Sequence, residues 1–171
     1  MVKLILVDKN DKKIGEDEKL KAHKEGKLHR AFSIIIINSR NHILLQKRAK
    51  CKYHCPGLWS NTACSHPLSG EKIEGAAGRR LKEEMGISCR IKKIGKFHYK
   101  EKFSNGLTEN EIDYVFLGRS NKKPRINKKE VSDYKWIPIS KIKKEINKKP
   151  GIYTYWFKLI IKKYFSKINR K

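Results

Sequence analysis

The sequence predicts a single α/β domain in which helices pack against a β-sheet. Residues 31–37, with the sequence AFSIIII, are apolar on both alternating faces, which is typical of a central strand covered on both sides. Residues 71–85 carry apolar side chains at helical spacing and are followed by Gly86, a residue that readily closes a helix. Strand-like segments lie on both sides of this helix in the sequence, and a second helical segment ends the chain. Together they predict one sandwich.

The first half of the chain is expected to be mainly strands. The predicted elements are a strand at 2–7, a helical segment at 16–24 that stops near Gly26, the central strand at 31–37, a strand at 43–48 and a long loop at 49–70. The turn residues at 38–41 predict that the two strands beside them form a hairpin. Loops as long as 49–70 are usually functional in compact domains, so this one is a candidate for part of a site.

The second half is expected to add strands and helices around the helix at 71–85. These elements are a strand at 88–99, a hairpin loop at 100–108, strands at 109–118 and 131–139, a short helix capped by Ser140 and a final helix at 154–168. In the strand at 109–118, Ile112, Tyr114 and Phe116 alternate with Glu111, Asp113 and Val115. The final helix is expected to bury Trp156, Leu159 and Ile160 and to leave its lysine-rich end in solvent.

The chain is strongly basic, with 42 Lys and Arg against 17 Asp and Glu, a formal net charge of +25 over 171 residues. Such a charge can attract nucleic acid, an anionic membrane or a polyanionic substrate. Lysine, isoleucine and asparagine recur throughout the chain, and lysine greatly outnumbers the arginine that nucleic-acid readers prefer. We therefore favour compositional drift over specific nucleic-acid binding.

The sequence also indicates a cytoplasmic setting. No apolar run approaches the ~20 residues that a membrane span needs. The first residues carry too short an apolar segment, followed too soon by charge, for a secretory signal. The four cysteines, at 51, 55, 64 and 89, do not resemble a disulfide scaffold, which favours a reducing compartment.

Two charged residues interrupt the apolar face of the helix at 71–85. Arg80 and Glu84 lie one turn apart within the stripe formed by Ile73, Ala76, Ala77 and Leu81. Because a buried charge is costly unless it is paired, the two side chains either form an internal ion pair or line a site for a charged ligand. The adjoining loop carries Cys64 and His66, which favours the second interpretation.

Histidines and carboxylates suggest a metal site. Glu109 and Glu111 are two residues apart on a predicted strand and therefore point to one face. With His23, His29 and His66 they would suit Zn²⁺, Mn²⁺ or Mg²⁺. Histidines scattered in sequence are more often surface residues, so spacing alone leaves both interpretations open.

Cys64 is the candidate for acid–base chemistry. A thiol in a polar loop beside a histidine can transfer protons, although a free thiol is usually a small buried hydrophobic group. A Cys₃His zinc site built from Cys51, Cys55, Cys64 and His66 is a third interpretation, with spacing unlike that of common zinc sites. If they converge, the side chains of Lys19, Arg48, Lys52 and Arg80 would bind a diphosphate; otherwise they are solvated cations.

Four motifs together resemble one enzyme family. They are HRAFS at 29–33, PGLWSNTACSHP at 56–67, RRLKEEMG at 79–86 and ENE at 109–111. Over residues 19–156 the chain resembles type I isopentenyl-diphosphate isomerases, whose fold is Nudix-like. The resemblance implies a Nudix-like α/β/α sandwich with a mixed sheet, and one domain over 1–171 whose first 28 residues contribute to the site. Residues 65–87 resemble a Nudix box in which Ser65 replaces a glycine and Arg80 replaces a metal-binding glutamate.

The resemblance also implies a role for each candidate residue in converting isopentenyl to dimethylallyl diphosphate. Cys64 and Glu111 would transfer protons, Tyr99 would assist Glu111, and Trp156 would face the developing cation. The implied diphosphate ligands are Lys19, Arg48, Lys52 and Arg80. One divalent metal (Mn²⁺, Zn²⁺ or Mg²⁺) would be bound by His23, His29, His66, Glu109 and Glu111, and Mg²⁺ on the diphosphate by Glu84 and the Cys64 carbonyl. We expect a cytoplasmic monomer or weak dimer that binds a prenyl diphosphate, with no specific nucleic acid and no membrane as partner. The alternative is a Nudix hydrolase of a nucleoside or prenyl diphosphate.

Overall fold

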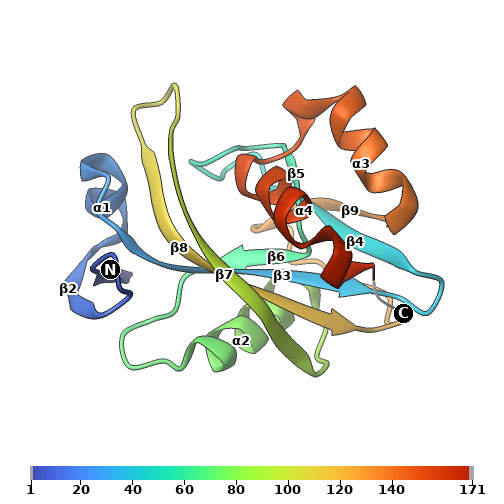
Figure 1. Ribbon diagram of the computed structural model, residues 1–171, viewed down its shortest axis with the longest axis horizontal. Coiled ribbons are helices and arrows are strands. Elements are labelled where there is room, and N and C mark those ends of the chain that lie inside the picture. Colours follow the sequence, from blue (N-terminus) through green and yellow to red (C-terminus); the bar gives the residue numbers. More distant parts are fainter. Residues whose placement is uncertain (1, 170–171) are drawn as a thin grey trace.

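The computed structural model describes residues 2–169, which form a nine-stranded mixed sheet with helices on both faces (Figure 1). Helix α2 (Ile73–Met85) covers one face, and α3 (Ile139–Lys148) and α4 (Tyr155–Ile168) lie on the other side. The predicted α/β/α sandwich with a mixed sheet is confirmed. Met1, Arg170 and Lys171 lie outside the described residues.

Strand β3 (His29–Ile37) is the centre of the sheet. It pairs in parallel with β8 (Thr108–Arg119) and antiparallel with β6 (Ala63–Ser65). Alternate side chains enter two cores, because Phe32, Ile34 and Ile36 pack in the core beneath α2 and Ile35 and Ile37 pack in the core beneath α4. The prediction of a strand covered on both faces is therefore confirmed.

Strands β3 and β4 (His42–Arg48) are joined by the predicted turn, but they do not form the predicted hairpin beyond it. The only register pair between these strands is Ile37 with Ile43, after which β4 pairs with β9 (Val131–Pro138) and β5 (Trp59–Ser60). The strands diverge because each pairs more extensively with a strand distant in sequence. Thr62 bridges the gap between them: its hydroxyl accepts from the Ile36 N–H (2.9 Å) and donates to the Leu44 carbonyl (2.7 Å).

The N-terminal segment begins with a second hairpin that the sequence did not reveal. Strand β1 (Lys3–Val7) pairs with β2 (Lys13–Glu18), so the predicted helical segment at 16–24 is strand in its first residues. Helix α1 (Lys19–Glu25) follows and ends at Gly26, whose φ of 63° lies in the left-handed region that favours glycine. The β1–β2 hairpin and α1 lie at one edge of the sheet (Figure 1).

The remaining elements agree with the sequence except at their ends and within the predicted loop at 49–70, which contains the short strands β5 and β6. Strand β7 (Ile91–Lys102) pairs along its length with β8, and the 3₁₀ helix η1 (Pro150–Ile152) precedes α4. Helix α2 begins at Ile73 rather than Glu71. Ser140 does not cap α3, because Pro138 is the N-cap and Ser140 lies within the first turn. In α4, Trp156 and Ile160 are buried as predicted, whereas Leu159 is only half-buried.

No helix within residues 2–169 combines the length and the apolar content that a bilayer span needs.

Thr62→Val tests the bridge between the diverging strands. The substitution keeps the side-chain shape but leaves the buried Ile36 N–H and Leu44 carbonyl without their partner. Since each of the two unsatisfied buried polar groups costs about 1–3 kcal/mol, we expect the free energy of unfolding in urea to fall by about 2–6 kcal/mol. Thr62→Ser, which retains the hydroxyl, is the matched control and should lose much less. Equal stability of Thr62→Val and the unsubstituted protein would contradict this account.

Candidate active site

A cavity of about 330 Å³ gathers the predicted site residues from separate parts of the chain. All eight predicted catalytic and substrate-binding residues line it: Lys19, Arg48, Lys52, Cys64, Arg80, Tyr99, Glu111 and Trp156. Of the other predicted metal ligands, His66 and Glu109 also line the cavity, and His23, His29 and Glu84 are buried close to it. Cys64 and Glu111 therefore face one cavity, as the predicted chemistry requires.

Two carboxylates on β8 form the buried centre of the site. Glu109 and Glu111 are 5% and 4% exposed, and both point to the face that also carries Val115 of the α4 core. The Tyr99 hydroxyl on the neighbouring strand β7 lies 2.9 Å from Glu109 Oε2 and 2.7 Å from Glu111 Oε2. Burial raises the pKa of Tyr99 well above its usual value, so its hydroxyl keeps the proton that it donates.

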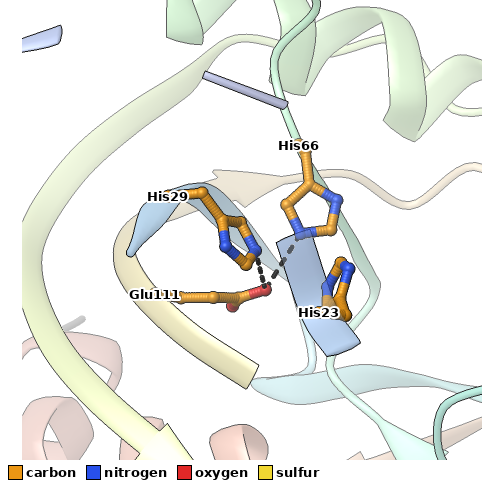
Figure 2. A group of neighbouring side chains, drawn as sticks. All are labelled: His23, His29, His66 and Glu111. Atoms are coloured by element: carbon orange, nitrogen blue, oxygen red, sulfur yellow. Dashed lines mark hydrogen bonds and ion pairs between the residues drawn. The ribbon is translucent and has the colours of Figure 1, made fainter. Parts of the chain in front are cut away.

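Three histidines converge on Glu111 from α1, β3 and the loop after β6 (Figure 2). Glu111 Oε1 lies 2.9 Å from His66 Nε2 and 3.4 Å from His29 Nε2. His23 completes the group, in which the candidate ligand atoms all lie within 4.8 Å of one another. The Nδ1 atoms of His23 and His29 lie 2.6 Å and 2.8 Å from the backbone carbonyls of Lys19 and Lys27. These contacts assign the proton to Nδ1 and turn Nε2 toward the group.

The group fits a divalent metal ion. The buried Nε2 of His23 and Nδ1 of His66 have no hydrogen-bond partner among the described residues. Burial, with neighbouring histidines, lowers the pKa of His23 to about 4, and burial together with Lys19 holds the pKa of His66 well below its usual value. Both imidazoles are therefore neutral at pH 7, the form that binds metals. Neutral imidazoles beside a carboxylate are the usual ligands of zinc and related ions.

The two proposed proton-transfer groups differ in protonation. Burial alone would raise the pKa of Glu111, but the facing His29 ring and the hydrogen bond from the Tyr99 hydroxyl lower it to about 2. Burial raises the pKa of the Cys64 thiol to about 12, and the Arg48 guanidinium, with Nη1 3.6 Å from Sγ, opposes this together with Lys52. At neutral pH the cavity thus holds one group with a transferable proton and one without.

Five cations line the cavity, the four predicted ones and Arg79, and two of the five form ion pairs with one carboxylate. Glu130 forms ion pairs with Arg80 (3.1 Å) and Lys52. Arg48 donates from Nε and Nη2 to the His54 carbonyl at 3.0 Å and 2.9 Å and so also fixes the loop after β4. Lys19 is half-buried, and burial lowers its pKa.

Arg80 and Glu84, on the inner face of α2, form an internal ion pair beside the cavity, so both interpretations of this pair from the sequence hold. Arg80 Nη2 lies 2.9 Å from Glu84 Oε1, which is the expected internal ion pair, while Arg80 also lines the cavity. Gln46 donates to the other Glu84 oxygen at 2.9 Å. Burial raises the pKa of Glu84, and Arg80 opposes the rise.

Trp156 lies against the cavity with its orientation fixed. Its indole N–H donates to Asn61 Oδ1 at 3.2 Å, and the Arg48 guanidinium carbon lies 5.2 Å from the ring centroid. A cation therefore already lies over the ring, which shows that this environment accepts positive charge.

Sequence reasoning missed three residues of the site. Asn61 orients Trp156, Glu130 pairs with two cavity cations, and His54 Nδ1 lies 2.7 Å from Glu109 Oε1. Of these, His54 and Asn61 had a sequence signal, because both lie in the long loop predicted to be functional and Asn61 is also part of the motif at 56–67. The Cys₃His zinc site is not formed among the described residues: no candidate metal group contains a cysteine, and the exposed Cys51 contacts the Lys129 carbonyl instead.

Comparison with known proteins agrees with this geometry. Residues 27–157 match the family model of the NUDIX domain. An isopentenyl-diphosphate Delta-isomerase 2 of Photorhabdus laumondii is 52% identical over 158 residues, covering 92% of this chain and 89% of that protein. The chain belongs to the isopentenyl-diphosphate Delta-isomerase family. An isopentenyl-diphosphate Delta-isomerase of Pectobacterium atrosepticum is 45% identical over 93% of this chain and 89% of its own.

Solved structures at lower identity support the fold alone. A protein from Deinococcus radiodurans superposes with a TM-score of 0.77 at 18% identity, covering 98% of this chain and 99% of its own. The MutT protein from Methanosarcina mazei Go1 superposes with a TM-score of 0.68 at 19% identity, covering 84% and 96%. The family that the motifs indicated, and its Nudix-like fold, are therefore confirmed.

The raised pKa of Cys64 predicts a slow thiol. Iodoacetamide reacts with thiolates, so Cys64 should be alkylated slowly at pH 7.5, with a rate that increases steadily up to about pH 12. Peptide mass spectrometry can follow each cysteine separately, with the exposed Cys51 as internal comparison and Cys64→Ala as blank. Alkylation of Cys64 at neutral pH as fast as that of Cys51 would contradict the protonated state.

Proposed function

We propose that this protein interconverts isopentenyl diphosphate and dimethylallyl diphosphate by adding and removing protons through a tertiary carbocation. The relatives named isopentenyl-diphosphate Delta-isomerase support this activity. The observation that carries the proposal is the cavity shared by Cys64, which holds its proton, and Glu111, which has lost its own.

The chemistry needs a proton to be added at one carbon of the substrate and another to be removed from a different carbon. Cys64 and Glu111 are the two transfer groups, one adding and the other removing the proton in each direction. Tyr99 assists by holding Glu111 through its hydroxyl. The Trp156 ring offers its negative face to the cation, a contribution of about 1–2 kcal/mol when water is excluded. Exclusion of water also prevents the cation from being trapped as an alcohol.

The cations bind the diphosphate end of the substrate. Lys19, Arg48, Lys52 and Arg80 face the same cavity as the transfer groups, so charge-assisted hydrogen bonds can hold the substrate away from its reacting carbons. Arg80 and Lys52 would then exchange their contacts with Glu130 for contacts with the diphosphate.

Two metal sites belong to this proposal. His23, His29, His66, Glu109 and Glu111 would bind one divalent ion (Mn²⁺, Zn²⁺ or Mg²⁺), and Glu84 with the Cys64 carbonyl would bind Mg²⁺ on the diphosphate. Bound metal supplies positive charge that orders the carboxylates and neutralises the phosphates. Around it, the chain's own residues fix the geometry, since Tyr99 and His66 already hold Glu111.

The surroundings of the site complete the proposal. We place the first 28 residues in the site, because α1 supplies both Lys19 and His23. The sequence supports a cytoplasmic enzyme that acts as a monomer or weak dimer, with a prenyl diphosphate as its small-molecule partner and no specific nucleic-acid or membrane partner.

Hydrolysis of a diphosphate is the competing function. The family model for the NUDIX domain gives it a basis. However, Arg80 occupies the box position where hydrolases carry a metal-binding glutamate, and it is engaged with Glu84 and Glu130. A cation at this position removes a ligand for the metal that hydrolysis needs.

Incubation with isopentenyl diphosphate and Mg²⁺ tests the proposal. We expect dimethylallyl diphosphate without phosphate release, followed by NMR and a phosphate assay. Cys64→Ala should lower kcat by about 10²–10⁴-fold, because it removes one of two proton-transfer groups. Cys89→Ala, at a half-buried cysteine outside the cavity, is the matched control and should keep full activity. Phosphate release, or full activity of Cys64→Ala, would contradict the proposed mechanism.

A further inference from the structure

His54 is a buried histidine beside the predicted metal ligands, and it lies outside the four motifs at 29–33, 56–67, 79–86 and 109–111. It lies in the loop after β4, is 4% exposed, and its ring centroid is 4.6 Å from that of His23. Its Nδ1 atom lies 2.7 Å from Glu109 Oε1, and together with His23 it forms a second candidate group around that carboxylate. A buried side chain this close to a predicted ligand requires an explanation.

The two carboxylates share too few hydrogen-bond donors unless a further residue contributes one. Tyr99 contacts both Glu109 and Glu111, but a hydroxyl carries one proton and can donate to only one of them at a time. Glu111 has His66 and His29 as additional partners. Apart from Tyr99, the Glu109 carboxylate contacts a single donor side chain among residues 2–169, and that side chain is His54.

The two nitrogen atoms of His54 have different surroundings. Nε2 is buried and has no hydrogen-bond partner among the described residues, whereas Nδ1 faces Glu109. A proton on Nε2 would be unsatisfied, so the neutral ring carries its proton on Nδ1, next to the carboxylate. Arg48 holds the backbone of this residue in place by donating twice to its carbonyl.

His23 argues against a second ion at the His54 position. The two candidate groups share His23, whose Nδ1 contacts the Lys19 carbonyl, so only its Nε2 is available to a metal. One such atom serves one ion. His54 is therefore better suited to hold Glu109 than to bind an ion of its own.

We propose that His54 is a positioning residue that holds the Glu109 carboxylate toward the metal ion through its Nδ1 atom. The proposal rests on the metal centre of the proposed function and adds a residue to it. Because the Tyr99 hydroxyl holds Glu111, His54 Nδ1 is the group that holds Glu109, through its Oε1 atom. Partners of this kind typically contribute about 10–100-fold to metal affinity.

The test compares three substitutions by metal affinity rather than activity. His54→Phe keeps a buried ring without a donor. In His54→Asn the amide nitrogen takes the place of Nδ1, and in His54→Gln it takes the place of Nε2. His42→Phe, at a half-buried histidine outside the centre, is the matched control. The dissociation constant and stoichiometry for Mn²⁺ and Zn²⁺, without diphosphate, are measured by competition with a chelator.

We expect His54→Phe to bind the metal about 10–100-fold more weakly, with unchanged stoichiometry, and His54→Asn to recover most of that loss. Unchanged affinity in His54→Phe would overturn the proposal. Recovery by His54→Gln but not by His54→Asn, or a second ion in the unsubstituted protein that His54→Phe loses, would make His54 a ligand and also overturn it.

The outcome is distinguishable from failure of the proposed function. An unsubstituted protein that binds no ion would overturn the metal centre and the role of His54 together. Metal binding with the expected pattern but without isomerase activity would leave the role of His54 standing. Because His54→Asn preserves the contact to Glu109, it remains informative if His54→Phe fails to fold, which circular dichroism would reveal.

Discussion

The two buried carboxylates on β8 impose the constraint on which the rest of the site depends. A carboxylate out of water is costly unless donors or cations surround it, and Glu109 and Glu111 are both almost fully buried. Their partners come from distant segments: Tyr99 from β7, His29 from β3, His54 from the loop after β4 and His66 from the loop after β6. The need of these two carboxylates for hydrogen-bond partners therefore brings four distant segments of the chain to one site.

The same constraint explains how the cavity can hold groups of opposite character. Donors around Glu111 keep it ionised, while the apolar side of the cavity keeps the Cys64 thiol protonated. Cys64 packs at the edge of the α4 core, and Trp156 belongs to that core. Cations at the other side attract a diphosphate, so a substrate with a charged end and an apolar end matches the cavity along its length.

Features set by local sequence were predictable. The two-faced apolar pattern of β3 placed it at the centre, and the spacing of two residues in Glu109-Asn110-Glu111 placed both carboxylates on one face. The divergence of β3 and β4 was not predictable, because it follows from pairing with β8 and β9 far along the chain. The sequence predicts helix for residues 16–18, the end of the polar strand β2, because their pairing with β1 and not their composition makes them a strand.

The site residues also divide into those that local sequence indicates and those that depend on contacts between distant segments. The predicted set was found largely through family motifs, whereas spacing alone left the histidines ambiguous. His54 and Glu130 had no periodic or paired signal, since each acts through contacts made only after folding. Of the 42 lysines and arginines, five line the cavity, so the site accounts for a small part of the positive charge.

The central claim is that Cys64 and Glu111 move protons to and from one substrate in one cavity. Turnover of isopentenyl diphosphate in D₂O, followed by NMR, tests it most directly, because the protons on both groups exchange with solvent. The account predicts dimethylallyl diphosphate that carries deuterium in the newly formed methyl group. Product formed without any deuterium, or substrate recovered unchanged by an enzyme with its metals bound, would contradict it.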